Sequence, residues 1–336
     1  MTIVMVNVGL DYHEDSIRVC VVDEQGEVLV NRDVENHPAA VQDLILQWGH
    51  PAGIAIEACC GAASFAHEFE KLFEWKIQMA HPGYVKQLKQ GPDKTDYGDA
   101  HLLADLVRVN YLPEVWIADQ FTRQLRRLVR YREGLASQRR DTKLRIRALL
   151  REERIRSPQA RPWTKAWLAW LDEASLGEHS RWVMSELQQQ LQRLEEDLKR
   201  VEQHMEAAIA DDAVSQKLLE QPGIGLVTAI TLRAEVGRFD RFRSGKQLSR
   251  YCGVTPRNAS SGKRQADAGL VGRSNRNLRA VVIQAAQRLP RHEDRWRELK
   301  NRLRKTKPAS VATAAIANRW LRWLYHQMLE SYEQAA

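Results

Sequence analysis

The segment Ile3-Val4-Met5-Val6-Asn7-Val8-Gly9-Leu10-Asp11 opens the chain with an almost unbroken apolar run that stops at an acid. An apolar run of this length, rich in β-branched residues, is typical of a buried strand. Ser16–Val22 and Glu27–Val30 are also rich in strand-forming residues, and Glu24-Gln25-Gly26 between them indicates a hairpin turn. The chain is therefore predicted to begin with three antiparallel strands.

Helices and strands alternate after these three strands. Pro38–Trp48 and Ala62–Phe73 have helical patterns, whereas Gly53–Glu57 and Lys76–Ala80 are short apolar strands. Alternation of this kind adds parallel strands to the same sheet. Three antiparallel strands followed by a βαβ unit is the ribonuclease-H-like arrangement, so the predicted fold of residues 1–117 is α/β and ribonuclease-H-like.

Four acids in this part of the chain are predicted to meet. Asp11 follows the first strand directly and Glu57 ends the fourth, and ligand sites of open α/β sheets lie at the carboxyl ends of strands. Asp96 and Asp99 lie three residues apart at the start of a predicted helix, so they share one face of it. That helix can cover the same edge of the sheet. Taken singly, each acid is explained equally well as a turn or capping residue, but the ordered set is not.

Carboxylates crowded at short range raise one another's pKa, and a divalent cation relieves that repulsion. Oxygen ligands without His or Cys select Mg²⁺ or Mn²⁺, and a pair of such ions stabilises the attacking and leaving oxygens of phosphoryl transfer. The predicted cofactor is therefore Mg²⁺ (or Mn²⁺), held by the four acids. His13 lies in the first hairpin and is expected to be solvated.

Charge is divided sharply along the chain. Residues 1–117 contain 8 Lys or Arg against 18 Asp or Glu, a balance of −10, so the remaining 43 Lys or Arg against 25 acids give +18. A basic surface of this size favours polyanions, because neutralising phosphates releases their counterions. Nucleic acid is the predicted partner of residues 118–336.

The sequence also indicates the compartment. The four cysteines form no CxxC pair and have no zinc-site spacing, as in a reduced intracellular protein. No stretch approaches the about 20 apolar residues that span a bilayer, and the first residues lead into a strand without the basic start of a signal peptide. We expect a soluble protein of the bacterial cytosol or nucleoid, with no membrane partner.

Residues 118–215 are predicted to form basic helices and a coiled-coil arm. Thirteen Lys or Arg and four acids fall in the range Arg123–Arg156, which predicts one long basic amphipathic helix or two helices that meet at Gly134. A solvated helix face would show the same pattern. The one-sided charge nevertheless favours contacts with a nucleic-acid backbone, with Arg126 and Arg130 as candidates.

Two apolar patterns follow within the same region. Apolar residues recur from Met184 to Ala208 in alternating steps of three and four, which is the heptad seam of a coiled coil. The seam can pair within the chain, with the basic helix, or between chains; pairing between chains, giving a dimer or tetramer, is the preferred interpretation. Trp163, Trp167 and Trp170 have helical spacing and are interpreted as core rather than as a surface for base stacking.

Residues 216–336 form the basic C-terminal module. Pro222-Gly223-Ile224-Gly225 separates two predicted helices, as in helix-hairpin-helix turns, where the amides around glycines such as Gly223 and Gly225 hold a phosphate. An ordinary helical hairpin explains the pattern equally well.

A second loop of this module, Gly253–Arg264, carries the hydroxyls of Ser260 and Ser261. Cations beside a serine can hold a phosphate and stabilise charge on a serine alkoxide. No histidine base is adjacent, so the activation of a serine is not explained locally. The cations of the loop and of the segment after it are Arg257, Lys263, Arg264, Arg273 and Arg276.

Together these motifs resemble the DEDD-type transposases of the insertion-sequence 110/1111 group and their Piv-like DNA invertases. The resemblance covers nearly the whole chain, and its motifs are specific in combination although each is weak alone. It is carried by Gly9-Leu10-Asp11, Ile56-Glu57-Ala58, Lys94-Thr95-Asp96 with Asp99-Ala100, Pro222-Gly223-Ile224-Gly225, Gly253-Val254-Thr255-Pro256, Ser261-Gly262 and Asn277-Leu278-Arg279.

The resemblance implies a RuvC-like domain whose four acids bind Mg²⁺, and a C-terminal transposase domain whose serine attacks DNA to form a covalent phosphoserine link. By motif position the nucleophile is Ser261, with Ser260 as the alternative. The resemblance also implies a bridge RNA, a non-coding RNA of the element that pairs with donor and target DNA and selects the sites. Ser274 stands where family members often have Gly, which could stiffen an approach of the backbone to DNA.

Two other functions fit the same residues. A junction-resolving nuclease would use water in place of serine and form no covalent adduct. The protein could instead bind RNA or DNA with an inactive catalytic domain. In that case the Asp11→Ala variant would keep every measurable activity.

Overall fold

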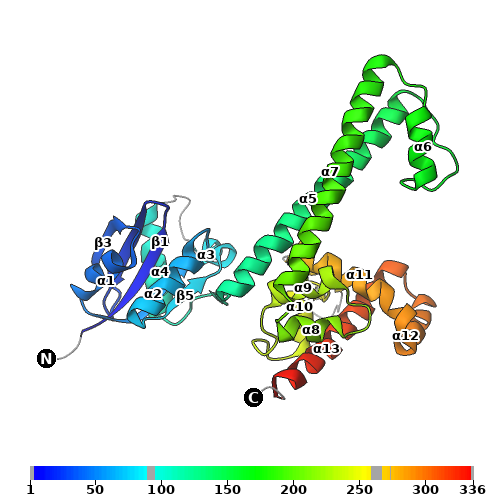
Figure 1. Cartoon of the computed structure of the whole chain (residues 1–336). Coiled ribbons are helices and arrows are strands. Elements are labelled where there is room, and N and C mark those ends of the chain that lie inside the picture. The colour runs from blue at the N-terminus through cyan, green and yellow to red at the C-terminus, as the bar shows by residue number, and fades with distance from the viewer. Residues whose placement is uncertain (1–3, 89–94, 259–266, 273, 334–336) are drawn as a thin grey trace. The chain divides into compact units, whose positions relative to one another are not determined.

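The computed structural model describes residues 4–88, 95–258, 267–272 and 274–333 (Figure 1). The chain divides into two compact units, Met1–Gln120 and Phe121–Ala336. The first unit is mixed α/β and the second is almost entirely helical, as predicted for the two parts of the chain. Among the described residues, no helix is long and apolar enough to cross a membrane.

A six-stranded sheet forms the centre of the N-terminal unit, in the order β3-β2-β1-β4-β5-β6. The first three strands pair antiparallel, β4 lies parallel to β1, β5 lies parallel to β4, and β6 closes the edge antiparallel to β5. The predicted antiparallel strands and the predicted parallel pair are confirmed. The strands are β1 (Met5–Tyr12), β2 (Ser16–Val22), β3 (Val28–Glu35), β4 (His50–Glu57), β5 (Ile77–Ala80) and β6 (Glu114–Val115).

Helices cover both faces of this sheet. The helices are α1 (Pro38–Leu46), α2 (Ala62–Phe73), α3 (Pro82–Leu88) and α4 (Asp96–Arg108). On one face, α1 and α2 bury their apolar residues against Val8 and Leu10 of β1. On the other face, α4 packs against small side chains of the sheet such as Ala55. Successive residues of a strand point to opposite faces, so Gly9 of β1 points to α4.

Two long helices, α5 (Gln120–Glu152) and α7 (Glu178–Ala208), form an arm of the second unit (Figure 1). The predicted heptad seam of α7 is buried against α5 of the same chain, where Leu198 and Val201 join Val129 in one apolar cluster. The seam therefore pairs with the basic helix of the same chain. The preferred interpretation of the sequence, pairing of the seam between chains, is wrong. Oligomerisation stays a prediction and would need another surface.

The basic helix of the arm is continuous. Arg132 of α5 pairs with Glu202 of α7 at 2.7 Å, and Lys143, further along α5, pairs with the earlier Glu195 at 3.3 Å, so the helices run antiparallel. Gly134 lies inside α5, and the predicted alternative of two helices that meet there is wrong. Glycine costs a helix about 1 kcal/mol relative to alanine, and burial of the neighbouring Leu135 offsets that cost.

A small cluster closes the far end of the arm. Helix α6 (Lys165–Glu173) buries Trp167 and Leu171 against Met184 of α7 and against the end of α5. The interpretation of the three tryptophans as core is confirmed: Trp167 is buried, and Trp163 and Trp170 pack against the same cluster. Trp163 lies before α6 rather than on it, so the three tryptophans do not share one helix.

The remaining helices form a C-terminal body around Phe239 and Trp320, both fully buried. Arg233 fastens the start of α5 to this body: its Nε lies 3.0 Å from Asp212 Oδ2, and its Nη1 donates to Thr122 Oγ1 at 2.9 Å. The elements of the body are α8 (Ala213–Leu219), α9 (Leu226–Val236), α10 (Gly245–Tyr251), β7 (Pro256–Asn258), β8 (Asp267–Leu270), α11 (Arg276–His292), α12 (Asp294–Arg304) and α13 (Ala309–Glu333).

Candidate functional site

Strand register brings Asp11 and Glu57 to the same edge of the sheet. In the parallel pair of β1 and β4, Leu10 is the partner of Ile56, so the following residues, Asp11 and Glu57, lie side by side. Neighbouring parallel strands lie about 4.8 Å apart, and residues in register point to the same face. Both acids therefore point to the face of the sheet that α4 covers.

Gly9 allows α4 to approach this face closely. A Cβ atom at Gly9 would overlap the carbonyl oxygen of Ala100 and lie 2.5 Å from the amide nitrogen of Ala104. The backbone of α4 thus rests directly on β1, two residues before Asp11. At the start of the helix, the Thr95 hydroxyl accepts a hydrogen bond from the Gly98 amide at 3.2 Å, which fixes the first turn.

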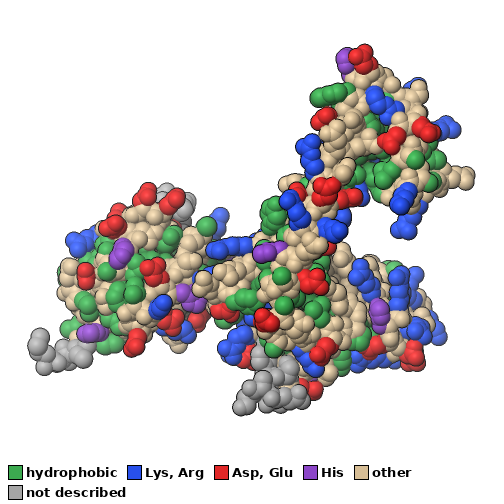
Figure 2. Space-filling view, in the orientation of Figure 1, with side chains coloured by type: hydrophobic (Ala, Val, Ile, Leu, Met, Phe, Trp, Pro, Cys, Tyr) green, Lys and Arg blue, Asp and Glu red, His purple; other side chains and the backbone are tan. Residues whose placement is uncertain are grey.

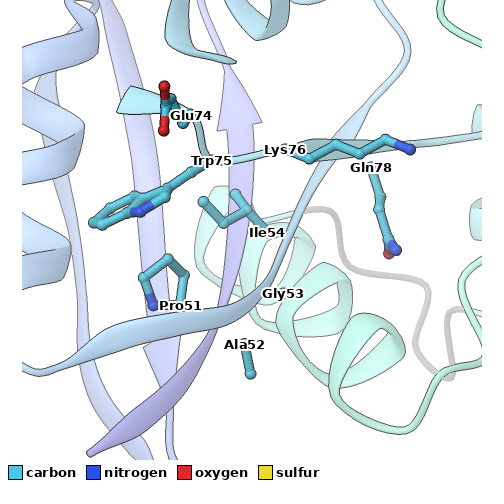
Figure 3. Close-up of a pocket in the computed structure, with 8 residues that line it drawn as sticks. All are labelled: Pro51, Ala52, Gly53, Ile54, Glu74, Trp75, Lys76 and Gln78. Carbon is cyan, nitrogen blue, oxygen red and sulfur yellow. The ribbon is translucent and has the colours of Figure 1, made fainter. Parts of the chain in front are cut away.

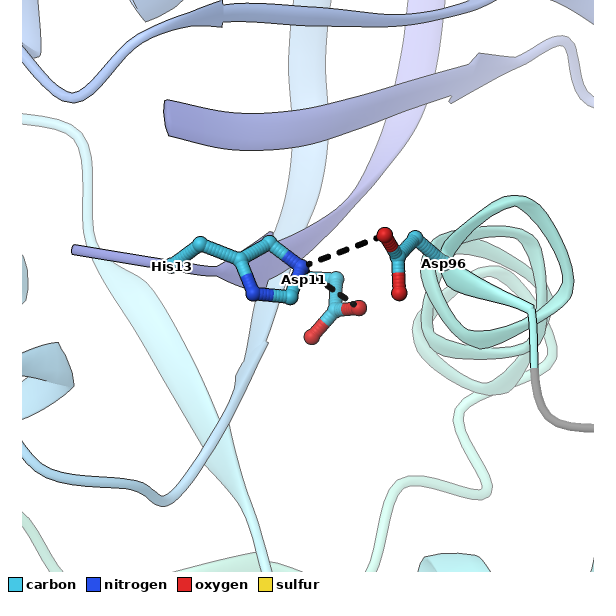
Figure 4. Close-up of side chains that lie close together, drawn as sticks. All are labelled: Asp11, His13 and Asp96. Atoms are coloured by element: carbon cyan, nitrogen blue, oxygen red, sulfur yellow. Dashed lines mark ion pairs between the residues drawn. The ribbon is translucent and has the colours of Figure 1, made fainter. Parts of the chain in front are cut away.

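The close approach places Asp96 beside Asp11, with His13 between them (Figure 4). His13 Nε2 lies 3.4 Å from Asp11 Oδ2 and 3.5 Å from Asp96 Oδ2. The side chain of Asp11 is 18% exposed and that of Asp96 is 49% exposed, so the group opens to solvent on the helix side. His13 is exposed, as predicted for a residue of the first hairpin, but its ring also belongs to this cluster, which was not predicted from the sequence.

The other two predicted acids lie next to this group. Asp99 is 8% exposed and belongs to the same first turn of α4 as Asp96. Burial raises the pKa of the Cys59 thiol, and the negative charges of Asp11 and Glu57 raise this pKa further. Both acids therefore lie close to the same sulfur atom. The structure thus brings Asp11, Asp96 and His13 into direct contact range and sets Glu57 and Asp99 on the adjoining strand and helix turn.

This donor set fits a divalent cation. One oxygen each from Asp11 and Asp96 and one ring nitrogen of His13 all lie within 4.8 Å of one another. Carboxylates suit Mg²⁺ and Mn²⁺, and an imidazole nitrogen can join them as a further ligand. The sequence signal for His13 is its position two residues after Asp11, on the same side of an extended chain.

A pocket of about 300 Å³ opens at the opposite end of the same strands (Figure 3). It is lined by the starts of β4 and β5, including Gly53, Trp75 and Lys76. Strand direction separates it from the acids, which follow the strands' carboxyl ends. It is therefore not part of the acidic site.

In the C-terminal body, β7 and β8 form an antiparallel ribbon in which Asn258 is the partner of Asp267. The segment between them, residues 259–266, lies outside the described residues, and so do the predicted Ser260, Ser261, Lys263 and Arg264; Arg273 lies outside them as well. Arg257 is exposed on β7, and Arg276 is exposed at the start of α11.

The base of this ribbon is held by Arg279, which donates to the Val271 carbonyl and to the Ser274 hydroxyl. Gly253 has a φ of 72°, and a Cβ atom there would overlap the Ser274 hydroxyl. Ser274 therefore ties the segment before α11 to the turn after α10. Ser274 thus has a structural role in this chain.

The turn between α8 and α9 keeps its predicted form. Gly223 has a φ of 79°, a conformation that favours glycine, and Gly225 is the exposed N-cap residue of α9 with no atom near the position of a Cβ. The backbone at Gly225, directly before α9, is therefore open to solvent on the side where a Cβ would lie.

The two predicted arginines of α5 differ in their surroundings. Arg126 donates to the Ala234 carbonyl at 2.8 Å and lies 3.9 Å from Glu235, so it helps to hold α5 against α9. Arg130, one turn further along, is exposed. Lys and Arg side chains continue along the arm and over α12 (Figure 2).

Comparison with known proteins gives consistent matches. A family model described as "Transposase" matches residues 8–154, and a second, described as "Transposase IS116/IS110/IS902 family", matches residues 215–301. The chain is 30% identical to a "Probable family 20 transposase" of Pseudomonas aeruginosa over 95% of both chains. It is 24% identical to the transposase for IS1328 of Yersinia enterocolitica over 94% of both. It is 27% identical to the transposase for IS1111A of Coxiella burnetii, over 84% of this chain and 78% of that one.

Proposed function

This chain belongs to the IS116/IS110/IS902 family of transposases, whose work is DNA transposition and recombination, and on that premise we propose that Ser261 is its nucleophile toward DNA. In the proposed reaction the Ser261 oxygen attacks the scissile phosphate in line. An O–P bond to serine forms, and the bond to the 3′ oxygen breaks. The hydroxyl proton leaves to a base, and the departing 3′ oxygen takes up a proton. Attack of a 3′ hydroxyl on the phosphoserine reverses these steps and joins the new strands.

The acids of the N-terminal unit are proposed to hold Mg²⁺ or Mn²⁺ for this reaction. When bound, such a cation neutralises charge on the phosphate and on the leaving oxygen. Asp11, Glu57, Asp96 and Asp99 would supply the oxygens, with His13 beside them. The observation that supports the proposal most directly is the convergence of Asp11 and Asp96 on one point, although 84 residues separate them in the sequence. The proposed domain is ribonuclease-H-like, which agrees with the observed strand order.

The proposed partners are donor and target DNA, an RNA that guides their choice, and further copies of this chain. The basic second part of the chain supports a polyanionic partner. We expect one discrete RNA species to copurify with the protein expressed from its own element, and sequencing of the bound nucleic acid would identify it. Recovery of only random cellular RNA would refute guidance by RNA.

The metal site gives a prediction of its own. Asp11→Asn should weaken Mn²⁺ binding at least about 10-fold, because a neutral amide replaces a charged ligand at the centre of the cluster. Titration calorimetry of the full chain would measure the change. Asp43→Asn is the matched control, since Asp43 is an exposed acid of α1 on the other face of the sheet. Equal Mn²⁺ affinities in both variants would remove Asp11 from the site.

A further inference from the structure

A second pocket, of about 270 Å³, lies on the arm between α5 and the segment before α6. It is a feature of the second unit alone and belongs to none of the motifs that carry the family resemblance. Its lining residues are Ala136, Arg139, Arg140, Lys143, Leu144, Arg147 and Trp163.

Helical spacing gathers the four cations of this pocket on neighbouring stripes of α5. Arg139, Lys143 and Arg147 follow one another at intervals of four residues, which places them on one face of the helix. Lys143 is paired with Glu195, and Arg140 lies 3.3 Å from its neighbour Asp141. Within the described part of the chain, no acid forms an ion pair with Arg139 or Arg147. The pocket thus keeps an excess of positive charge.

The apolar side of the pocket is equally unusual. Leu144 is 53% exposed, a high value for a leucine in a packed arm. Trp163 has a φ of 71°, a conformation that bulky L-residues rarely adopt, and the surrounding structure must hold it there. Its ring centroid lies 4.7 Å from that of the buried Trp167 and 4.9 Å from Lys143 Nζ. Trp167 is buried in the core, whereas Trp163 packs against that core and also forms part of the pocket wall.

We propose that this pocket binds an unpaired stretch of nucleic acid, with a base against Leu144 and Trp163 and the adjoining phosphates on Arg139, Arg140 and Arg147. Basic grooves with aromatic walls bind single strands in this way, because every base has an apolar face that can stack. A base inside a duplex already has both faces stacked, so only an unpaired base can use the aromatic wall. The inference does not rest on the nucleophile or on the metal site.

The charge of the pocket is tested with a matched pair of double variants. Arg139→Gln with Arg147→Gln removes two pocket cations, and Arg193→Gln with Arg200→Gln removes two exposed cations from α7 of the same arm. Fluorescence anisotropy of the full chain with a labelled single-stranded oligonucleotide would be recorded over a range of salt concentrations. The pocket variant should bind about 10-fold more weakly, and its slope of log K against log salt should fall by about 1.4, or 0.7 for each lost phosphate contact.

The control variant should change single-strand affinity by less than about 2-fold, because its cations lie outside the pocket. Equal losses in the two double variants would overturn the proposal and leave only diffuse attraction by the arm. Parallel titrations with DNA and RNA oligonucleotides of the same sequence show whether the pocket prefers single-stranded DNA or RNA. A greater loss of duplex binding than of single-strand binding would also contradict the proposal.

The aromatic wall is tested separately with Trp163→Asn. Asparagine tolerates a positive φ, so the backbone can keep its path while the ring is removed. Single-strand affinity should fall about 10-fold with an unchanged salt slope, since no charge is lost. Thermal unfolding reports whether the arm stays folded. If it does not, the two double variants of the arginines still test the pocket. Wild-type affinity in a folded Trp163→Asn would refute the role of the ring.

Discussion

Ser261→Ala should abolish the covalent protein–DNA adduct and lower strand exchange by on the order of 10⁴-fold or more, the scale on which loss of a nucleophile acts in enzymes. Alanine removes only the hydroxyl that would form the bond to phosphorus. The measurement uses labelled DNA of the element's ends with the full chain, its copurified RNA and Mg²⁺, followed by denaturation and gel separation of protein-linked label.

The neighbouring Ser260→Ala is the matched control, because it removes a hydroxyl from the same loop. It should keep the adduct within a fewfold of wild type. An adduct that survives in Ser261→Ala and disappears in Ser260→Ala would move the nucleophile by one residue. Cleavage that persists without any adduct would instead favour the junction-resolving nuclease, in which water attacks the phosphate.

Gly9→Ala should destabilise the N-terminal unit by about 3 kcal/mol and remove most Mn²⁺ binding. The added methyl would overlap the Ala100 carbonyl oxygen and crowd the Ala104 amide nitrogen. Both are backbone atoms of α4, so neither can turn aside. Helix α4 must then lift from β1, and Asp96 moves away from Asp11 with it. Thermal unfolding and Mn²⁺ titration measure the two effects.

Gly134→Ala is the control for this substitution. A Cβ atom at Gly134 would meet nothing within 4 Å, and the residue lies inside α5, so alanine should stabilise the arm by up to about 1 kcal/mol. A Gly9→Ala protein with wild-type unfolding temperature and Mn²⁺ affinity would show that α4 does not depend on the close approach.

Much of the N-terminal unit could be predicted because its strands are bounded clearly. Ser16–Val22 and Ala62–Phe73 have the predicted bounds, since each is an unbroken pattern between turn residues. The meeting of Asp11 and Glu57 followed from strand order alone. The short β6 was missed, because two residues show no alternation.

Other features depend on tertiary contacts that a local pattern does not record. The proximity of His13 to Asp96 depends on where α4 begins, and the sequence of the hairpin does not record that position. Glycine at position 134 suggested a break in the helix, but the apolar contacts of α7 hold the helix through it. The positive φ of Trp163 leaves no trace in the spacing of the three tryptophans, so its place before α6 rather than on that helix could not be foreseen.

The contact of Arg126 with Ala234 marks where α5 leaves the C-terminal body, and the arm pocket is centred near Lys143, 17 residues further along the same helix. At 1.5 Å per residue, this rise is roughly 25 Å, close to the length of seven stacked base steps. Helix α5 is continuous and its apolar side is buried against α7, so the distance between these two points of the helix is fixed. On the proposal that the arm pocket holds an unpaired strand, this fixed rise would set the distance between that strand and any nucleic acid bound to the C-terminal body.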